Sequence, residues 1–330
     1  MEIVLLTTHP TSACAFYRSV GVLQQLRKLD PTINFRMSDS SNWASIGNAD
    51  IVFLERPQDE RFVKAIQDCK ALGIPVWSDF DDDLFNLEKS NPGYSFYSQK
   101  KTQLAMAYSI ANSDIVTVST QLIADSFIQR FPEKLNLEVV PNALNDYFFP
   151  LVQKENQENR ISWRGSRTHR ADLLKYKTEM LDFAKEHPTI EWNFFGEDLW
   201  YITEGIQNSF AYSEDDLIKY MYKFNSIKPS VHLVPLVDNH FNRCKSNIAW
   251  IEATWVGASC VLPSFPEFEK GKNHTYSSGL TFKSILNELI LNKSRRQETY
   301  LSSFEYINKY LLLSRVNKTR LEIAKNIRRK

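Results

Sequence analysis

The sequence predicts an α/β protein made of two Rossmann-like domains that face each other across a cleft. At 330 residues the chain is long enough for two separate hydrophobic cores. Short β-rich runs alternate with helical periodicity in both halves, which is typical of parallel sheets covered by helices. Between the halves, the stretch 141–150 reads PNALNDYFFP, and its turn formers and two prolines predict a hinge. We therefore expect a first domain over residues 1–145 and a second over residues 146–311.

The first half is expected to form a doubly wound unit. Its apolar runs predict five strands, at residues 3–6, 50–54, 75–80, 114–119 and 137–140. Apolar residues at helical spacing predict helices over residues 16–29, 62–70, 101–112 and 120–130, and the second of these stops at Gly73. Sheets of this kind bind ligands at the carboxyl ends of their strands, so the residues that follow each strand are the functional candidates.

The second half repeats the pattern. Strands are expected at residues 160–163, 190–195, 230–237, 259–262 and 280–282, with helices over 171–186, 214–224 and 247–256. Ser213 is expected to cap the middle helix, with Asp216 in the capping-box position. Helical sequence then continues through residues 283–291 and 296–327.

Composition excludes several classes of protein. No apolar run reaches the roughly 18 residues of a membrane span. The N-terminus, MEIVLLTTHPTS, lacks the basic region of a signal peptide and reads as a first strand. The four cysteines form no CxxC pair and predict no disulfide. A reduced protein of the cytoplasm is the simplest interpretation.

The stretch 241–265, FNRCKSNIAWIEATWVGASCVLPSF, predicts a loop, a helix, a glycine turn and a buried strand. Ser246 is expected to cap the helix, and a helix start beside Lys245 favours an anion. Glu252, almost two turns further in, would then face neutral hydroxyl groups of the same ligand. This combination suits a nucleotide diphosphate. A core helix with a solvated Lys245 explains the spacing equally well.

Several segments carry a family resemblance, and they follow one another in the family's order. They are ADIVFLERP, DFDDDLF, SDIVTVST, VVPNALN, ISWRGSRTHRADL and IEATWVGASCVLPS. On these segments the chain resembles the GT-B glycosyltransferases, in particular the retaining, nucleotide-sugar-dependent enzymes of family 4, and it is similar to compact members found in bacteriophages. The resemblance implies a hexosyl- or pentosyltransferase that takes its sugar from a nucleotide-diphosphate sugar, with a UDP-sugar favoured. It implies no further cofactor and no metal, and a cytoplasmic site of action, that of the host for a viral member.

The resemblance also implies where the donor binds. Glu252 matches the second glutamate of the family's E-x7-E motif, which binds the ribose, whereas Cys244 stands where the first glutamate would fall. Lys245 and Ser246 would hold the diphosphate. The turn after the first strand of the second domain would add further donor contacts, from Arg164, Gly165, Ser166 and His169, with Arg167 and Arg170 as further candidates for phosphate.

The acidic run of the first domain is the candidate acceptor side. We expect Asp79 and Asp81 to bind the acceptor as catalytic groups, together with Lys245, and Asp82 or Asp83 to cap the next segment. Two alternatives stay open for the run: a metal site of the Asp-x-Asp type and a solvated acidic turn. Arg18 is expected either to pair with this run or to meet donor phosphate, and His9 is expected to border the cleft.

The two halves of the chain carry opposite net charge. Residues 1–145 carry 13 basic against 17 acidic side chains, a net −4, and residues 146–330 carry 27 against 22, a net +5. The resemblance implies that a C-terminal helix, about residues 312–330, packs back on the first domain, where its basic end would cover acidic surface. A DNA acceptor would require a basic face, so the acidic first domain counts against one.

The acceptor stays open among a glycan, a lipid-linked sugar, a protein and a hydroxymethylated pyrimidine in DNA. Two non-catalytic interpretations remain beside the transferase: a two-domain protein that binds a nucleotide or sugar, and a silent relative that the cysteine at position 244 would explain.

Overall fold

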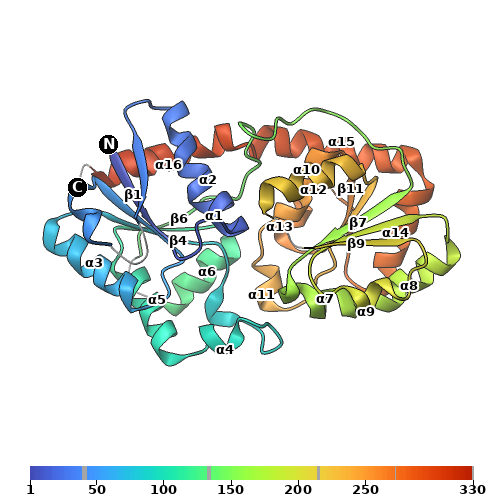
Figure 1. Cartoon of the computed structure of the whole chain (residues 1–330), viewed down its shortest axis with the longest axis horizontal. Coiled ribbons are helices and arrows are strands. Elements are labelled where there is room, and N and C mark those ends of the chain that lie inside the picture. The colour runs from blue at the N-terminus through green and yellow to red at the C-terminus, as the bar shows by residue number, and fades with distance from the viewer. Residues whose placement is uncertain (39–42, 132–134, 214–215, 272, 329–330) are drawn as a thin grey trace.

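The computed structural model describes residues 1–38, 43–131, 135–213, 216–271 and 273–328, which form two lobes (Figure 1). Each lobe is built on a six-stranded parallel sheet, so the predicted fold class is confirmed. The first sheet has the order β2-β1-β3-β4-β5-β6, with strands Glu2–Leu6 (β1), Asn34–Ser38 (β2), Ile51–Glu55 (β3), Val76–Phe80 (β4), Ile115–Val118 (β5) and Leu137–Val139 (β6). The second has the order β12-β11-β10-β7-β8-β9, with strands Arg160–Arg164 (β7), Glu191–Phe195 (β8), Ser209–Tyr212 (β9), Val231–Leu233 (β10), Ser259–Pro263 (β11) and Thr275–Tyr276 (β12).

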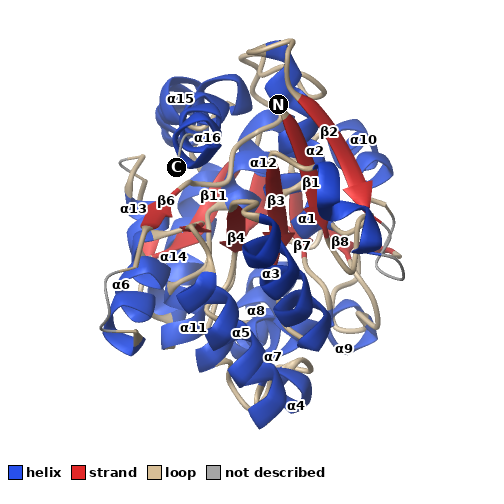
Figure 2. Ribbon diagram, turned by 90° about the vertical axis from the view of Figure 1, so that its left-hand side faces the viewer, coloured by secondary structure: helices blue, strands red, loops and turns tan. Residues whose placement is uncertain are grey.

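Helices cover both faces of each sheet (Figure 2). Those of the first lobe are Ala13–Arg18 (α1), Val20–Leu23 (α2), Glu60–Leu72 (α3), Tyr94–Tyr97 (α4), Lys100–Asn112 (α5) and Gln121–Arg130 (α6), with 3-10 turns Gln24–Lys28 (η1), Trp43–Asn48 (η2) and Leu84–Asn86 (η3). Those of the second lobe are Arg170–Lys175 (α7), Lys177–Glu186 (α8), Trp200–Thr203 (α9), Leu217–Ile227 (α10), His240–Arg243 (α11), Ile248–Val256 (α12), Pro266–Glu269 (α13), Gly279–Leu291 (α14) and Lys293–Tyr310 (α15), with the 3-10 turn Arg167–His169 (η4).

Local sequence explains where several helices begin and end. Thr120 caps α6 by accepting from the backbone N–H of Ile123, and Gly73 ends α3 in the left-handed conformation, with φ of 68°. The helical region expected over residues 16–29 is divided into α1, α2 and η1. The side chain of Asp216 caps α10, so the capping role predicted for Ser213 is wrong, and the predicted start of that helix at residue 214 lies outside the described residues.

One predicted strand is a helix. Residues 280–282 belong to α14, because Ser278 and Thr281 form a capping box at its start. Three strands were not expected from the sequence. They are β2 and β9, which are largely exposed, and the two-residue β12.

The last helix, Leu313–Arg328 (α16), crosses from the second lobe and lies against the first (Figure 1). Its apolar side joins the core of the first sheet through Leu313, Val316 and Ile323. Two basic side chains near its end pair with acidic groups of that lobe, Lys325 with Asp30 at 3.0 Å and Arg328 with Asp50 at 3.1 Å. Among the described residues, no helix has both the length and the apolar character that crossing a membrane requires.

Candidate active site

A cavity of about 630 Å³ lies between the two lobes, at the carboxyl ends of both sheets. Most residues predicted to be functional line it: Arg18, Asp81 and Asp82 from the first lobe, and Arg164, Gly165, Ser166, His169, Lys245, Ser246 and Glu252 from the second. Four do not. His9 is exposed, and Asp79 is buried behind the wall of the cavity. Arg167 pairs with Glu197 at 2.6 Å, and Arg170 lies over the ring of Tyr201 at 4.8 Å.

Glu252 occupies the centre of the second lobe's wall. Its position on α12 leaves it 1% exposed, and two phenols donate to its carboxylate, Tyr17 at 2.7 Å and Tyr220 at 3.2 Å. Tyr17 belongs to α1 of the first lobe, so this hydrogen bond joins the two lobes across the cavity. Burial, and then the neighbouring Glu252 carboxylate, hold the pKa of both phenols well above its ordinary value, so both remain donors.

Two cations line the cavity, and one of them pairs with this carboxylate. Arg164, the last residue of β7, places its Nε 2.8 Å from Glu252, and its buried Nη2 has no hydrogen-bond partner. Lys245 lines the same cavity, with its Nζ 4.0 Å from Asp82 and 4.6 Å from the ring centre of Phe241. Neither cation is fully satisfied within the protein, which is the state expected of groups that receive an anionic ligand.

The turn that follows Arg164 depends on glycine. A Cβ at Gly165 would lie 2.6 Å from a ring carbon of Trp163, and the Gly165 carbonyl oxygen would lie 2.2 Å from a Cβ at Gly196. The carboxyl ends of β7 and β8 therefore approach each other more closely than side chains would permit. This close approach shapes the wall of the cavity at Ser166.

Gly165→Ala is therefore expected to destabilise the protein by about 1–3 kcal/mol, because the added methyl group must displace a buried indole. Thermal or denaturant unfolding measures the loss. Gly47→Ala is the matched control, since no atom lies within 4 Å of a Cβ at that position. Equal stability of the two variants would contradict this account of the turn.

Ser246 does not cap α12, contrary to the prediction. The N-cap residue is Asn247, which makes no side-chain cap bond. The hydroxyl of Ser246 instead accepts a hydrogen bond of 2.7 Å from Asn142 in the segment between the lobes. Asn142 in turn accepts from Arg18 at 3.1 Å. Ser246 thus connects the donor-side loop to the first lobe.

His169 lies in the cavity wall with its ring held by Asp172. The Nδ1 atom is 3.0 Å from one carboxylate oxygen, and the other oxygen accepts from the backbone of Val237 and from Asn242. Burial and the charge of Lys245 lower the pKa of His169 below its usual value, against the opposite effect of Asp172. The imidazole is therefore neutral at pH 7, with its Nδ1–H donating to Asp172 and Nε2 able to accept.

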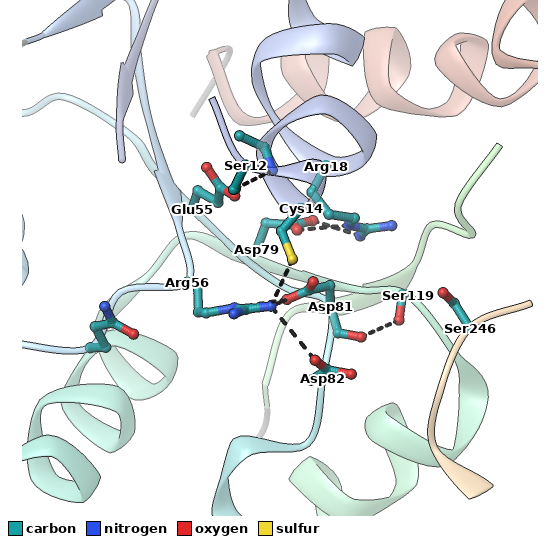
Figure 3. Close-up of polar contacts among 12 residues, drawn as sticks. Ser12, Cys14, Arg18, Glu55, Arg56, Asp79, Asp81, Asp82, Ser119 and Ser246 are labelled. Atoms are coloured by element: carbon teal, nitrogen blue, oxygen red, sulfur yellow. Dashed lines mark hydrogen bonds and ion pairs between the residues drawn. The ribbon is translucent and has the colours of Figure 1, made fainter. Parts of the chain in front are cut away.

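The acidic run is balanced by arginines (Figure 3). Arg18 donates to both carboxylate oxygens of Asp79, at 2.7 and 2.9 Å. Of the two roles predicted for Arg18, the structure shows the pairing with the acidic run. Arg56 donates through both Nε and Nη2 to one oxygen of Asp81, Oδ1, and its Nη2 also lies 3.6 Å from Asp82. The guanidinium groups of Arg18 and Arg56 thus supply positive charge to the crowded carboxylates of Asp79 and Asp81.

Asp83 stands at the N-cap position of η3, yet its carboxylate makes no cap hydrogen bond to the backbone. The expected cap is therefore absent at Asp83. Its side chain is turned toward the second lobe instead, where it meets His240 at 2.9 Å.

The Arg56–Asp81 pair predicts a pH-dependent stability. Burial alone would raise the pKa of Asp81, but Arg56 outweighs it and lowers that pKa from 3.8 to about 2. A depressed pKa contributes stability that is complete above pH 4 and is lost as the pH falls toward 2. The difference is on the order of 2 kcal/mol.

The free energy of unfolding of wild type and of Asp81→Asn should therefore converge between pH 4 and pH 2 in denaturant titrations. Asp238→Asn, which breaks an exposed pair with Arg243, is the control and should show little difference at any pH. A constant gap between wild type and Asp81→Asn would show that Asp81 is not the titrating group.

Sequence reasoning missed four residues of this site. Arg56 directly follows β3 and has a left-handed backbone, with φ of 46°, so its position after a strand could have identified it. Tyr17, Asp172 and Tyr220 carried no such signal. Their importance depends on contacts between segments far apart in the chain, such as the 235 positions between Tyr17 and Glu252.

Two Rossmann-like lobes with a cavity between them make up the arrangement known as the GT-B fold. No protein-family model matches the chain, and no curated protein sequence matches it. Solved structures of low sequence identity do resemble it. Anabaena HepE in complex with UDP and glucose superposes with a TM-score of 0.67 at 10% identity, over 99% of this chain and 100% of HepE.

Two further structures share the fold. UDP-GlcNAc 2-epimerase from Neisseria meningitidis, bound to UDP-GlcNAc, gives a TM-score of 0.59 at 12% identity, over 98% of this chain and 99% of the epimerase. A variant of S. aureus TarM in complex with fondaparinux, α-GlcNAc-glycerol and UDP gives 0.61 at 13% identity, over 83% of this chain and 55% of TarM. This chain therefore spans about half the length of TarM. At these identities the likeness establishes the fold alone.

Proposed function

We propose that the protein is a glycosyltransferase that moves a sugar from UDP-sugar to an acceptor hydroxyl with retention of configuration. One observation carries the proposal: the cavity between the lobes combines two incompletely satisfied cations, Arg164 and Lys245, with a buried carboxylate, Glu252. Similar structures that hold UDP or UDP-GlcNAc support a uridine nucleotide as the ligand.

The donor binds to the second lobe, residues 146–311 in the proposed division. Glu252 accepts from the ribose hydroxyls, for which its carboxylate retains free lone pairs beside the two phenols. Arg164 and Lys245 meet the diphosphate, and the turn at Gly165 and Ser166 allows its backbone to come close. Ser246 holds the loop that carries Lys245.

The transfer requires little acid–base machinery from the protein. Charge develops on the departing diphosphate, and Lys245 and Arg164 stabilise it from fixed positions. The departing phosphate itself can take the acceptor proton on the same face of the sugar. Asp81, with its pKa lowered to about 2, stays ionised and acts as an acceptor for hydrogen bonds rather than as a base.

The acceptor binds to the first lobe, residues 1–145 in the same division. Asp81, Asp82 and Arg56 face the cavity there, and they offer a mixed polar surface for hydroxyl groups. Asp79 supports this surface indirectly, because its carboxylate fixes Arg18. No metal ion takes part in this scheme.

A second candidate function is isomerisation of a UDP-sugar, because a UDP-GlcNAc 2-epimerase shares the fold over nearly its whole length. A panel of nucleotide sugars separates the two. The transferase releases UDP, slowly to water and faster with its acceptor, whereas an isomerase returns a new UDP-sugar and no free UDP. A thermal-shift screen of the same panel first identifies the donor, since a ligand of the native state raises its stability.

The acceptor panel contains glycans, lipid-linked sugars, a protein and DNA with 5-hydroxymethyl-pyrimidines. Transfer to one class identifies the acceptor. Tight binding of a UDP-sugar without UDP release or isomerisation, in every combination, would contradict an enzymatic function and leave a binding protein.

A further inference from the structure

Outside the cavity, three side chains with metal-binding atoms meet at the seam between the lobes. Asp83 follows β4 of the first lobe, His240 opens α11 of the second, and Cys244 follows that helix. Their candidate ligand atoms all lie within 4.8 Å of one another. The Nε2 atom of His240 is 2.9 Å from the carboxylate of Asp83 and 3.5 Å from the sulfur of Cys244. None of the three lines the cavity.

The three groups form a donor set that suits zinc. A carboxylate oxygen, an imidazole nitrogen and a thiolate sulfur are the usual ligands of Zn²⁺, with bonds of about 2.0–2.3 Å. Tetrahedral geometry at such bond lengths sets ligand atoms roughly 3.3–3.8 Å apart. The separation of 3.5 Å between Nε2 of His240 and the sulfur of Cys244 falls in this range. Nε2 lies on Oδ2 of Asp83 at 2.9 Å, so the imidazole would turn toward Oδ1 to share an ion with it.

A second observation points to a missing cation. Asp83 is fully buried, and its Oδ1 atom has no hydrogen-bond partner. An unpaired buried carboxylate oxygen is costly. The other oxygen, Oδ2, lies 2.9 Å from Nε2 of His240 and also accepts from Asn86 at 2.8 Å and from Ser126 at 2.7 Å, which orients the carboxylate as the outer support of a metal ligand does. Oδ1 is thus left free for a ligand.

Burial and exposure at the cluster also suit an ion. Cys244 is 1% exposed, so a thiolate there is protected from bulk solvent, whereas the side chain of His240 is 54% exposed and offers a path of entry. In addition, the hydroxyl of Thr120 in the first lobe donates to the backbone carbonyl of Cys244 at 2.9 Å. This contact fixes the position of Cys244 against the first lobe independently of any ion.

We propose that Asp83, His240 and Cys244 bind one Zn²⁺ ion, which ties α11 of the second lobe to the acidic turn of the first. The Cys244 thiol releases its proton to solvent and binds as thiolate, and a water molecule fills the fourth position. The ion acts on the arrangement of the lobes and takes no part in sugar transfer. The proposal therefore does not depend on the proposed function.

Metal binding by the full chain tests this proposal directly. After removal of metal with a chelator and dialysis, we expect calorimetric titration with Zn²⁺ to show one ion per chain and thermal unfolding to shift upward with Zn²⁺. Titration with Co²⁺ should give the near-ultraviolet charge-transfer absorption of a cobalt–thiolate bond. Cys244→Ser and His240→Gln should each lower Zn²⁺ affinity by more than the roughly 10- to 100-fold that an outer partner is worth.

Matched controls come from the same chain. Cys69→Ala removes another buried thiol and His274→Gln another exposed imidazole, and both should keep wild-type Zn²⁺ binding. His240→Gln alters a half-exposed side chain, so it keeps the test decisive if Cys244→Ser fails to fold. Folded wild type without saturable Zn²⁺ binding, a Co²⁺ complex without thiolate absorption, or equal affinity in His240→Gln would each overturn the site and leave a hydrogen-bonded seam.

Discussion

Glu252→Gln is expected to weaken UDP binding by roughly 10- to 100-fold, because a hydrogen bond to a charged group contributes about 1.5–3 kcal/mol. The loss should be specific to the ribose. Wild type should bind 2′,3′-dideoxy-UDP much more weakly than UDP, and this difference should nearly vanish in Glu252→Gln. Calorimetric titration of both nucleotides against both proteins measures the four affinities, which form a thermodynamic cycle.

Glu267→Gln provides the control for burial and charge. Glu267 is 5% exposed and pairs with Lys270, and it lies outside the cavity, so its substitution should leave both affinities unchanged. Unfolding curves are needed for both variants, since Glu252→Gln also removes the countercharge of Arg164. If Glu252→Gln lost affinity equally for the two nucleotides, the ribose would not lie at Glu252.

Much of the fold was predictable because most strands here are buried on both faces. The strands β1, β3, β4 and β5 are buried almost throughout and consist mainly of apolar residues, as burial on both faces favours, and the sequence identified all four. The edge strand β2, NFRMS, mixes polar and apolar residues and is partly exposed, so it has no such pattern. Residues 280–282 show the converse error. Their composition alone predicted a strand, whereas the capping box at Ser278 begins a helix that includes them.

The residues of the candidate site also fall into two groups, those whose position the sequence could predict and those whose position it could not. Residues at or just after the carboxyl ends of strands, such as Arg164 and Asp81, could be placed at the cavity from topology alone, since parallel strands bring these ends to one edge. Their partners could not. The ion pair between Arg18 and Asp79 and the hydrogen bond from Tyr17 to Glu252 join segments that are remote in the chain. Sequence periodicity contains no information about such side-chain contacts.

These contacts also make the two lobes interdependent. Tyr17 donates to Glu252, and Asn142 donates to Ser246, so groups of the first lobe and of the hinge hold both ends of the predicted donor site. A ribose that engages Glu252 must share its carboxylate with a phenol of the opposite lobe. If the donor binds as proposed, its binding should therefore be linked to the relative position of the lobes through the Glu252 carboxylate.

Lys245→Ala is expected to lower kcat for sugar transfer by roughly 10²- to 10³-fold, the loss typical when one group that stabilises transition-state charge is removed. Its ammonium group has only a distant ion-pair partner in the protein, Asp82 at 4.0 Å, and it lines the same cavity as Arg164. The negative charge on the diphosphate grows as the sugar departs, so the effect should fall mainly on kcat and less on KM. Steady-state kinetics of UDP release with the identified donor and acceptor measure both constants.

Arg243→Ala is the matched control for Lys245→Ala. Arg243 ends the neighbouring helix α11, and its pairing with Asp238 is exposed and outside the cavity, so kcat should remain near the wild-type value. Lys245→Arg should recover part of the lost rate, because it restores the charge but not the shape of the ammonium group. A wild-type kcat in Lys245→Ala would show that the leaving diphosphate is stabilised elsewhere, and Arg164 would then carry that role alone. The kinetic difference between these variants thus measures how the charge of the leaving group is shared between the two cations.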